Sequence, residues 1–434
     1  MAGIFGAVSK EDCIMDIISG IFYLQNRCEE YCGLAWKNGS GKLRNSTHKG
    51  LVKLNFDVNS RSWIKGNWAI GCVSGSREPV SELSEQGGML LCFDGNLHNY
   101  FEIKNNLLKS GIGFSGYHNP EEVGDAVLIS KIIRGERNFE DGVKRLIEQI
   151  VGDFAIVALT PKGVYAARGF GRKPLILGQR GDSYAVSSES VSFINSGFEI
   201  VRDVNPGEVV LLDEDGIHSI AQHNIGEIKY GTFEWIYTAH PASVIDGKSV
   251  ELVRNKIGAL MARKYNIEAD IVSPIPNSGR CHADGYAEES GIPHKEVFKK
   301  FDYCGRSFTP NSVEEQNVVA DEKLIPIKEL IKGKRIIIVD DSIVKGNQTR
   351  KQTTRLKEFG AKKVYAVIAC PPLVCACKYG KSIKKDEDCI AKRMSLEEIR
   401  VTRGLDGLYY ADMDMLEEAI GIPKEKLCSD CWGC

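Results

Sequence analysis

The sequence has no apolar run approaching the about 20 residues that a membrane-spanning helix needs. Its first residues also lack a basic segment followed by an apolar one, so we expect a soluble, unexported, cytoplasmic protein without a membrane partner. An excess of charge is missing too, since 56 Lys and Arg face 58 Asp and Glu. This balance gives no electrostatic reason to bind nucleic acid. At 434 residues, the chain should contain more than one domain.

The first half of the chain is rich in short strand patterns separated by Gly and Asn turns. Amphipathic helices are predicted at 12–25 and 121–134. Strands are predicted at 1–9, 34–37, 51–56, 68–73, 89–93, 154–159, 164–168, 184–187 and 209–213. This many strands indicates two packed sheets.

Beyond about residue 230, strands and helices alternate, as in a parallel α/β domain. A helix is predicted at 250–264, with Ser249 capping its first turn. Strands are predicted at 269–274, 336–339 and 364–369. The strand at 336–339 is a β-branched run, IIIV, which is typical of a central strand buried on both faces.

Two adjacent carboxylates, Asp340 and Asp341, directly follow this central strand. Ligands of open parallel sheets bind at the carboxyl ends of strands, where paired acids favour a cation or sugar hydroxyls. A polar turn around Gly346 then leads into a helix predicted to begin near Thr349 or Arg350, and such a turn suits a phosphate. Together these features predict a site for a sugar phosphate.

The stretch VDDSIVKG resembles the phosphoribosyl pyrophosphate (PRPP) loop of the glutamine PRPP amidotransferase family. In the first half, GIFG, LQNR, FDGN, GDAVL, KPL, SSES and NPGE follow in the order of that family's landmarks. The resemblance implies an α+β N-terminal nucleophile hydrolase-like sandwich of packed sheets over 1–230, of the type 2 glutamine amidotransferase kind. An α/β type I phosphoribosyltransferase domain with a Cys-rich tail would follow over 231–434.

The resemblance implies that the loop IPNSGR binds pyrophosphate through Asn277, Ser278 and Gly279. Gly279 would let main-chain amides approach the diphosphate, and Asn277 replaces an acid of the family motif. The segment YCGRSF resembles part of a mobile loop that closes over PRPP in the family. Lys300 and Arg306 would neutralise the leaving pyrophosphate there.

Asp340 and Asp341 are expected to be the catalytic residues, holding the ribose hydroxyls and, together with Ser278, Mg²⁺. The other predicted PRPP contacts are Ser342, Ile343, Val344, Lys345, Gly346, Asn347, Gln348 and Thr349. Asn347 and Gln348 stand where the family has two threonines, so side-chain contacts with the phosphate would be weaker.

The same resemblance implies a degenerate glutaminase pocket. The family's nucleophile is a Cys after the initiator Met, whereas Ala2 has no nucleophilic atom. Ser74 stands in place of an Arg that binds the glutamine carboxylate. Asp94 replaces an Asn whose amide faces the developing oxyanion. The pocket's other positions are Arg27, Gly95, Asn96 and Asp125.

Fourteen cysteines are many for a protein in a reducing compartment, and their clustering favours metal ligation over free thiols. Several family members carry a [4Fe–4S] cluster, and the resemblance places ligands at Cys377, Cys428 and Cys431. The fourth family position falls at Gly231, so Cys434 is the first candidate in its place. Three other candidates follow it, Cys375, Cys370 and Cys389. A structural Zn²⁺ held by four thiolates is the alternative.

We therefore expect a homo-oligomeric PRPP-dependent transferase of purine biosynthesis that places ammonia or another small amine on C1 of ribose 5-phosphate, with its glutaminase activity lost. One alternative is a non-catalytic paralogue that binds PRPP or a nucleotide and regulates a partner. The other is an active amidotransferase inactivated by an engineered Cys-to-Ala change at Ala2. Three changes in one pocket favour a natural loss.

Overall fold

The computed structural model describes residues 1–56, 64–82, 88–114, 123–301, 324–380, 383 and 385–433. The chain forms two compact units. Unit 1 contains Met1–Gly231, Thr238–Gly247 and Lys378–Ser382, and unit 2 contains Thr232–Tyr237, Lys248–Cys377 and Ile383–Cys434. The predicted boundary at residue 230 lies beside Gly231, but two short later segments also belong to unit 1. Within the described residues, no helix has the length and apolar character required to span a membrane.

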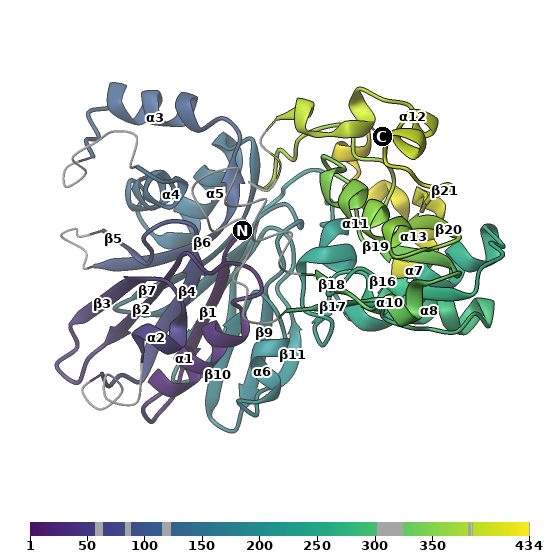
Figure 1. Cartoon of the computed structure of the whole chain (residues 1–434). Coiled ribbons are helices and arrows are strands. Elements are labelled where there is room, and N and C mark those ends of the chain that lie inside the picture. Colours follow the sequence, from purple (N-terminus) through teal and green to yellow (C-terminus); the bar gives the residue numbers. More distant parts are fainter. Residues whose placement is uncertain are drawn as a thin grey trace. The chain divides into compact units, whose positions relative to one another are not determined.

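Unit 1 is built on two antiparallel sheets (Figure 1). The first has the order β11-β9-β10-β1-β4-β2-β3, with strands β1 (Gly3–Val8), β2 (Tyr31–Lys37), β3 (Leu43–Lys49), β4 (Trp68–Ser74), β9 (Ile176–Arg180), β10 (Ser183–Ser187) and β11 (Glu199–Asp203). The second has the order β13-β12-β8-β7-β6-β5, with strands β5 (Val80–Glu82), β6 (Met89–Leu97), β7 (Gly152–Thr160), β8 (Gly163–Arg168), β12 (Glu208–Asp213) and β13 (Gly216–Gln222).

The two sheets of unit 1 pack face to face, and helices cover their outer faces. Ile4 and Ile70 of the first sheet share a buried cluster with Val157 and Val210 of the second. The first sheet's outer face is covered by α1 (Ile14–Tyr23), α2 (Val52–Asn55) and α6 (Val191–Ile194). The second is covered by α3 (Tyr100–Lys109), α4 (Asp125–Arg134) and α5 (Phe139–Gln149). The predicted sandwich is confirmed in this four-layer arrangement.

The strand predicted at 51–56 is wrong, because this stretch contains the short helix α2. Val52, Leu54 and Phe56 alternate as in a strand, but only Val52 and Phe56 are buried, and Leu54 is 79% exposed. Two buried residues four positions apart lie on one face of a helix. The alternation of apolar residues therefore misled the prediction.

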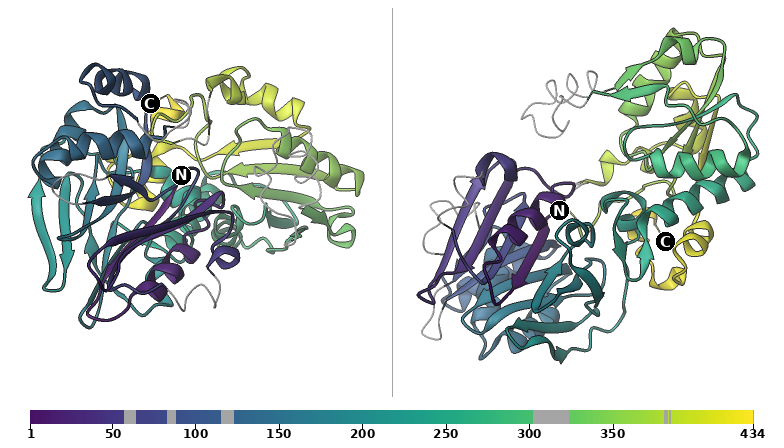
Figure 2. Two further views of the ribbon diagram at one scale, coloured as in Figure 1. Left: turned by 90° about the vertical axis from the view of Figure 1, so that its left-hand side faces the viewer. Right: turned by 90° about the horizontal axis from the view of Figure 1, so that it is seen from below.

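Unit 2 contains a parallel sheet of four strands in sequence order, β16 (Ile271–Pro274), β19 (Arg335–Asp340), β20 (Lys363–Ile368) and β21 (Gly407–Tyr410). Its longer helices are α7 (Val250–Lys264), α8 (Arg280–Ser290), α11 (Asn347–Glu358), α12 (Leu396–Thr402) and α13 (Met413–Ile420) (Figures 1 and 2). A short helix, α10 (Lys328–Ile331), and a two-stranded sheet of β17 (Phe298–Lys300) and β18 (Leu324–Pro326) complete it. The predicted central strand is confirmed as β19, with Ile336, Ile337, Ile338 and Val339 all buried.

Helices α7 and α8 meet at two glycines. A β carbon on Gly258 would lie 1.9 Å from the carbonyl oxygen of His282, and one on Gly285 would lie 1.9 Å from that of Asn255. Only glycine permits such close backbone contact. The predicted cap of α7 is also confirmed, because the Ser249 hydroxyl accepts a hydrogen bond from the N–H of Leu252 at 3.4 Å.

Candidate functional site

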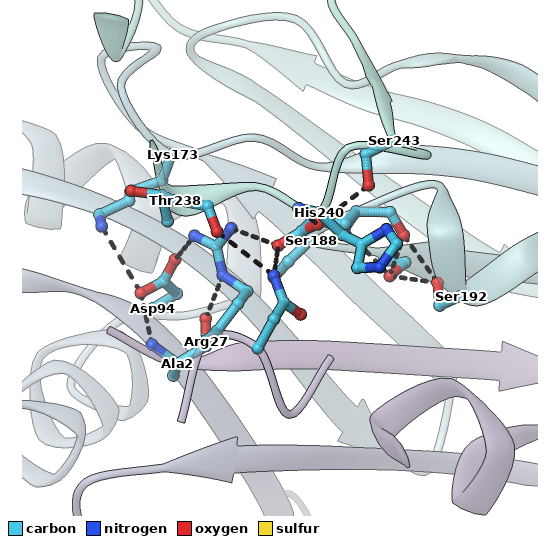
Figure 3. Close-up of polar contacts among 12 residues, drawn as sticks. Ala2, Arg27, Asp94, Lys173, Ser188, Ser192, Thr238, His240 and Ser243 are labelled. Carbon is cyan, nitrogen blue, oxygen red and sulfur yellow. Dashed lines mark hydrogen bonds and ion pairs between the residues drawn. The ribbon is translucent and has the colours of Figure 1, made fainter. Parts of the chain in front are cut away.

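In unit 1, the predicted pocket residues Ala2, Arg27 and Asp94 contact one another directly (Figure 3). Asp94 Oδ1 accepts a hydrogen bond from the main-chain N–H of Ala2 at 2.8 Å. Arg27 donates from Nε to the carbonyl of Ala2 at 2.7 Å and from Nη2 to Asp94 Oδ2 at 2.9 Å. Asp94 is thus a charged partner of the chain's first residues.

Two further charges, Lys173 and Glu189, complete this network. Lys173 Nζ lies 3.6 Å from Asp94 Oδ1, and Arg27 Nη1 donates to Glu189 Oε1 at 2.9 Å. Burial raises the pKa of Asp94, but the charges of Lys173 and Arg27 outweigh it and hold the pKa below its ordinary value. The network therefore pairs two cationic side chains, Arg27 and Lys173, with two carboxylates, Asp94 and Glu189.

The second oxygen of Glu189 is also engaged. Glu189 Oε2 accepts hydrogen bonds from the main-chain N–H of His240 at 2.7 Å and from Ser243 Oγ at 2.9 Å. The side chains of Arg27, Asp94 and Glu189 are fully buried. Such buried charges are tolerated only when each is paired, as here.

The remaining predicted pocket residues lie around this network. Ser74 is buried, and its hydroxyl donates to the carbonyl of Ser76 at 2.6 Å. Asp125, at the start of α4, accepts from the N–H of Leu97 at 3.3 Å. A β carbon on Gly95 would lie 2.2 Å from the carbonyl oxygen of Asp153, so this position requires glycine. Asn96 donates from Nδ2 to the carbonyl of Lys378 at 2.7 Å.

In unit 2, the loops after the neighbouring strands β16 and β19 meet at the carboxyl end of the sheet. The Ser278 hydroxyl donates to Asp340 Oδ1 at 2.9 Å, which brings two of the predicted magnesium ligands together. The Ser342 hydroxyl donates to Asp341 Oδ2 at 2.6 Å. Burial and the charge of Asp341 raise the pKa of Asp340 well above its ordinary value. The acid pair therefore carries a repulsion that a bound cation would relieve.

The loop Asn277, Ser278 and Gly279 is pressed against the end of β19. The N–H of Ile275 donates to the carbonyl of Val339 at 2.8 Å. A β carbon on Gly279 would lie 2.1 Å from the same carbonyl oxygen. The glycine thus allows the two loops to lie side by side, as the predicted approach to a diphosphate requires.

The predicted phosphate loop leads into α11 as expected, although the helix begins at Asn347 rather than near Thr349 or Arg350. Gly346 has a φ of 71°, in the left-handed region that favours glycine. The side chains of Asn347 and Gln348 are exposed, whereas Thr349 is 7% exposed. The free N–H groups of this first turn can bind an anion.

Of the other predicted ligand-binding residues, only some belong to the part of the chain that the structure describes. Lys300 ends β17 and is partly buried. Arg306 and Cys434 lie outside the described residues.

In unit 2, burial and the charges of Cys377 and Cys428 raise the pKa of Cys431, which places these three thiols in one neighbourhood. In the described part of the chain, no group of three or more His, Cys, Asp or Glu side chains is arranged to hold a metal ion.

Comparisons with known proteins match both units. The family model of the glutamine amidotransferase domain matches residues 67–195. The amidophosphoribosyltransferase of Methanothermobacter thermautotrophicus is 34% identical over 99% of this chain and 92% of its own length. This chain belongs to the amidophosphoribosyltransferase family. The Bacillus subtilis amidophosphoribosyltransferase is 32% identical over all of this chain and 92% of its own length.

The fold of this amidophosphoribosyltransferase family member also agrees with that of a solved structure. The glutamine PRPP amidotransferase of B. subtilis complexed with ADP and GMP superimposes with a TM-score of 0.90, at 31% identity, over 99% of this chain and 96% of that one. An N-terminal nucleophile hydrolase-like unit followed by a phosphoribosyltransferase unit is therefore confirmed.

Lys173 and Glu189 of this amidophosphoribosyltransferase family member were not predicted as site residues from the sequence. Both lie in stretches that were recognised only as landmarks, KPL and SSES. Arg27 and Glu189 are separated by 162 residues, so only the folded chain reveals that their charges meet. A lysine or glutamate inside a motif is the signal that could have found them, since both residue types are rarely buried without a partner.

Proposed function

We propose that this chain is a PRPP-dependent transferase that places ammonia or another small amine on C1 of ribose 5-phosphate and releases pyrophosphate. The observation that carries the proposal is the hydrogen bond between Ser278 and Asp340 at the carboxyl end of β19. It joins the predicted diphosphate loop to the acid pair. The loop around Gly346 and the start of α11 follow directly.

Each part of this site has a role in the displacement. Asp340 and Asp341 would hold the ribose hydroxyls and, directly or through water, Mg²⁺, whose charge neutralises the leaving pyrophosphate. The main-chain N–H groups at the start of α11 would hold the 5′-phosphate. The nitrogen lone pair of the amine forms the new bond to C1 as the bond from C1 to the pyrophosphate oxygen breaks, and the surplus proton on nitrogen passes to solvent. Positioning and charge neutralisation carry such a reaction without a covalent nucleophile.

We further propose that unit 1 does not hydrolyse glutamine. Ala2 offers no nucleophile, and Asp94 places a negative charge where the reaction would develop one. The pairing of Asp94 with Arg27 and the N–H of Ala2 supports this view, because these groups are satisfied by one another. Ser74 also lacks the cation that would bind a carboxylate.

Turnover of PRPP tests the proposal. We expect anaerobically purified protein with Mg²⁺ to release pyrophosphate when given ammonia or one amine from a panel, and none above background with glutamine. Pyrophosphate and the aminated ribose phosphate are measured together. Absence of release with every amine, alongside measurable PRPP binding, would instead support the non-catalytic paralogue that uses the same site for regulation.

An Ala2→Cys variant provides the second arm of this experiment. With Ser74 and Asp94 unchanged, the new thiol should give no glutamine hydrolysis, because the carboxylate and oxyanion partners are still missing. Recovery of glutaminase in this variant would contradict the proposed loss and support a single engineered change at Ala2.

We also propose that Cys377, Cys428 and Cys431 bind a [4Fe–4S] cluster, with Cys434 as the fourth ligand. The effect of Cys377 and Cys428 on the pKa of Cys431 supports a shared site, and thiolates suit either iron–sulfur or zinc. Iron and sulfide analysis of the anaerobic protein should give about four of each per chain. One zinc per chain without sulfide would favour the alternative Cys₄ site. Absence of iron, sulfide and zinc would exclude both the cluster and the zinc site.

A further inference from the structure

Three arginines lie beside the phosphate loop of unit 2. Arg350 is in the first turn of α11, and its N–H donates to the carbonyl of Gly346 at 3.1 Å. Arg403 directly follows α12, and its side chain lies against Gly346, where a β carbon would be 2.8 Å from Nε and 3.5 Å from Cδ. Arg393 follows the short helix Ile390–Lys392, which is joined to the loop by a hydrogen bond from the N–H of Ile390 to the carbonyl of Val344 at 2.8 Å.

In the part of the chain that the structure describes, these three arginines are not paired with an acid. Burial and the charges of Arg350 and Arg393 lower the pKa of Arg403. Among the described residues, none of the three forms a recorded ion pair with a carboxylate, and Arg403 Nε is buried without a hydrogen-bond partner. Like charges brought together in this way favour binding of an anion.

Neighbouring basic residues, by contrast, are paired. Lys345 Nζ lies 2.9 Å from Asp388 Oδ1, and Lys392 Nζ lies 2.7 Å from Asp386 Oδ2. Arg400 donates from Nε to Glu397 Oε2 at 2.7 Å. Carboxylates are therefore available in this part of the chain. Arg350, Arg393 and Arg403 differ from these neighbours, because no ion pair recorded among the described residues neutralises them.

We propose that Arg350, Arg393 and Arg403 form a binding site for the 5′-phosphate of the ribose substrate, in addition to the main-chain N–H groups of the loop. This proposal rests on the proposed function and deepens it. Asn347 and Gln348 replace two hydroxyl side chains at the same loop, and the arginines supply the lost affinity in another form. Guanidinium groups pair well with a dianionic phosphate monoester because they offer several donors in one plane.

The proposal is tested by measuring the binding of ribose 5-phosphate by calorimetry, in the absence of Mg²⁺ and of an amine. Arg403→Gln and Arg350→Gln should each raise the dissociation constant about tenfold, as expected for loss of one charged hydrogen bond. Both variants should also weaken the dependence of binding on salt. Their affinity for inorganic pyrophosphate, which is expected at the loop of Asn277 and Ser278, should not change.

Arg400→Gln is the matched control, because Arg400 lies on the neighbouring helix α12 but is already paired with Glu397. It should bind ribose 5-phosphate like the unsubstituted chain. Arg350 is exposed, so its variant also separates ligand binding from any loss of folding. The proposal is overturned if Arg403→Gln and Arg350→Gln bind normally, or if Arg400→Gln weakens binding equally. Because no turnover is needed, this result is independent of whether any amine is accepted.

Discussion

The free energy of unfolding of the Arg27→Met variant is expected to be about 3–5 kcal/mol lower than that of the unsubstituted chain at pH 7. Arg27 lies between the carboxylates of Asp94 and Glu189, both fully buried. Removing the guanidinium leaves two negative charges in the core, and Lys173 compensates only Asp94, from 3.6 Å. Urea unfolding, together with hydrogen exchange of the β1 and β6 amides, measures the loss within unit 1.

The same variant should lose more stability as the pH rises. In the unsubstituted chain, the charges of Lys173 and Arg27 hold the pKa of Asp94 below its ordinary value, so the ionised Asp94 stabilises the folded state above a pH of about 4. Loss of Arg27 removes part of this stabilisation, which is absent in acid, where Asp94 is protonated. The deficit relative to the unsubstituted chain should therefore be smallest in acid.

Arg180→Met is the matched control for Arg27→Met. Arg180 also makes a two-pronged contact with a carboxylate, Asp16, but its side chain is 40% exposed. An exposed ion pair contributes about 0–1 kcal/mol. Equal losses in both variants would contradict the view that the buried network is the source of the effect.

Replacing Asp340 with asparagine should have opposite effects on binding and stability. Loss of one carboxylate from the acid pair should weaken Mg²⁺-dependent PRPP binding about 100-fold, as loss of a charged contact implies. The ligand-free variant should be about 1 kcal/mol more stable at pH 7, because the repulsion from Asp341 is removed. Calorimetry and thermal unfolding measure the two effects.

The pH dependence of the stability gain has a definite sign. Asp340 has a raised pKa in the folded protein, so the folded state holds its proton at pH values where the unfolded chain has lost it. The contribution of Asp340 to the stability of the folded chain therefore falls as pH rises above about 4, the ordinary pKa of an aspartate. The advantage of Asp340→Asn should grow over the same range.

Asp270→Asn serves as the control of opposite sign. Hydrogen bonds from the Arg335 side chain and N–H lower the pKa of Asp270 to about 2, so this carboxylate stabilises the folded state once it is ionised. Its replacement should reduce stability and leave PRPP binding unchanged. If Asp340→Asn behaved like Asp270→Asn in both measurements, the acid pair would not be the ligand site.

The strands that could be predicted from the sequence are mostly those in the interior of the sheets. Central strands such as β4 and β19 are buried on both faces, and their apolar runs are evident. The four edge strands of unit 1, β3, β5, β11 and β13, were all missed. Edge strands such as β3, LRNSTHK, carry polar residues toward solvent and have no clear apolar period.

The acid pair and its loop could be predicted because the residues are consecutive and follow a recognisable strand. The resemblance to the amidotransferase family implied that Ser278 and Asp340 belong to one site, and the structure contains a hydrogen bond between them. The partners of Arg27 and the contact of Arg403 with Gly346 could not be predicted, because they join distant segments of the chain. A sequence shows which residues carry charge, whereas only folding decides which charges meet.

The buried charge network of unit 1 also limits how this chain can change over generations. If the glutaminase activity has been lost as proposed, a return to glutamine chemistry would require replacements at Ala2, Ser74 and Asp94. Asp94→Asn would leave Lys173 and Arg27 with one buried anion fewer, and Ser74→Arg would add a cation to a closed core. Each of these two charge-changing steps would cost a large share of the about 5–15 kcal/mol by which a domain is stable. On the proposed loss of glutaminase activity, the network would act as an evolutionary ratchet, in which losing that activity is easier than recovering it.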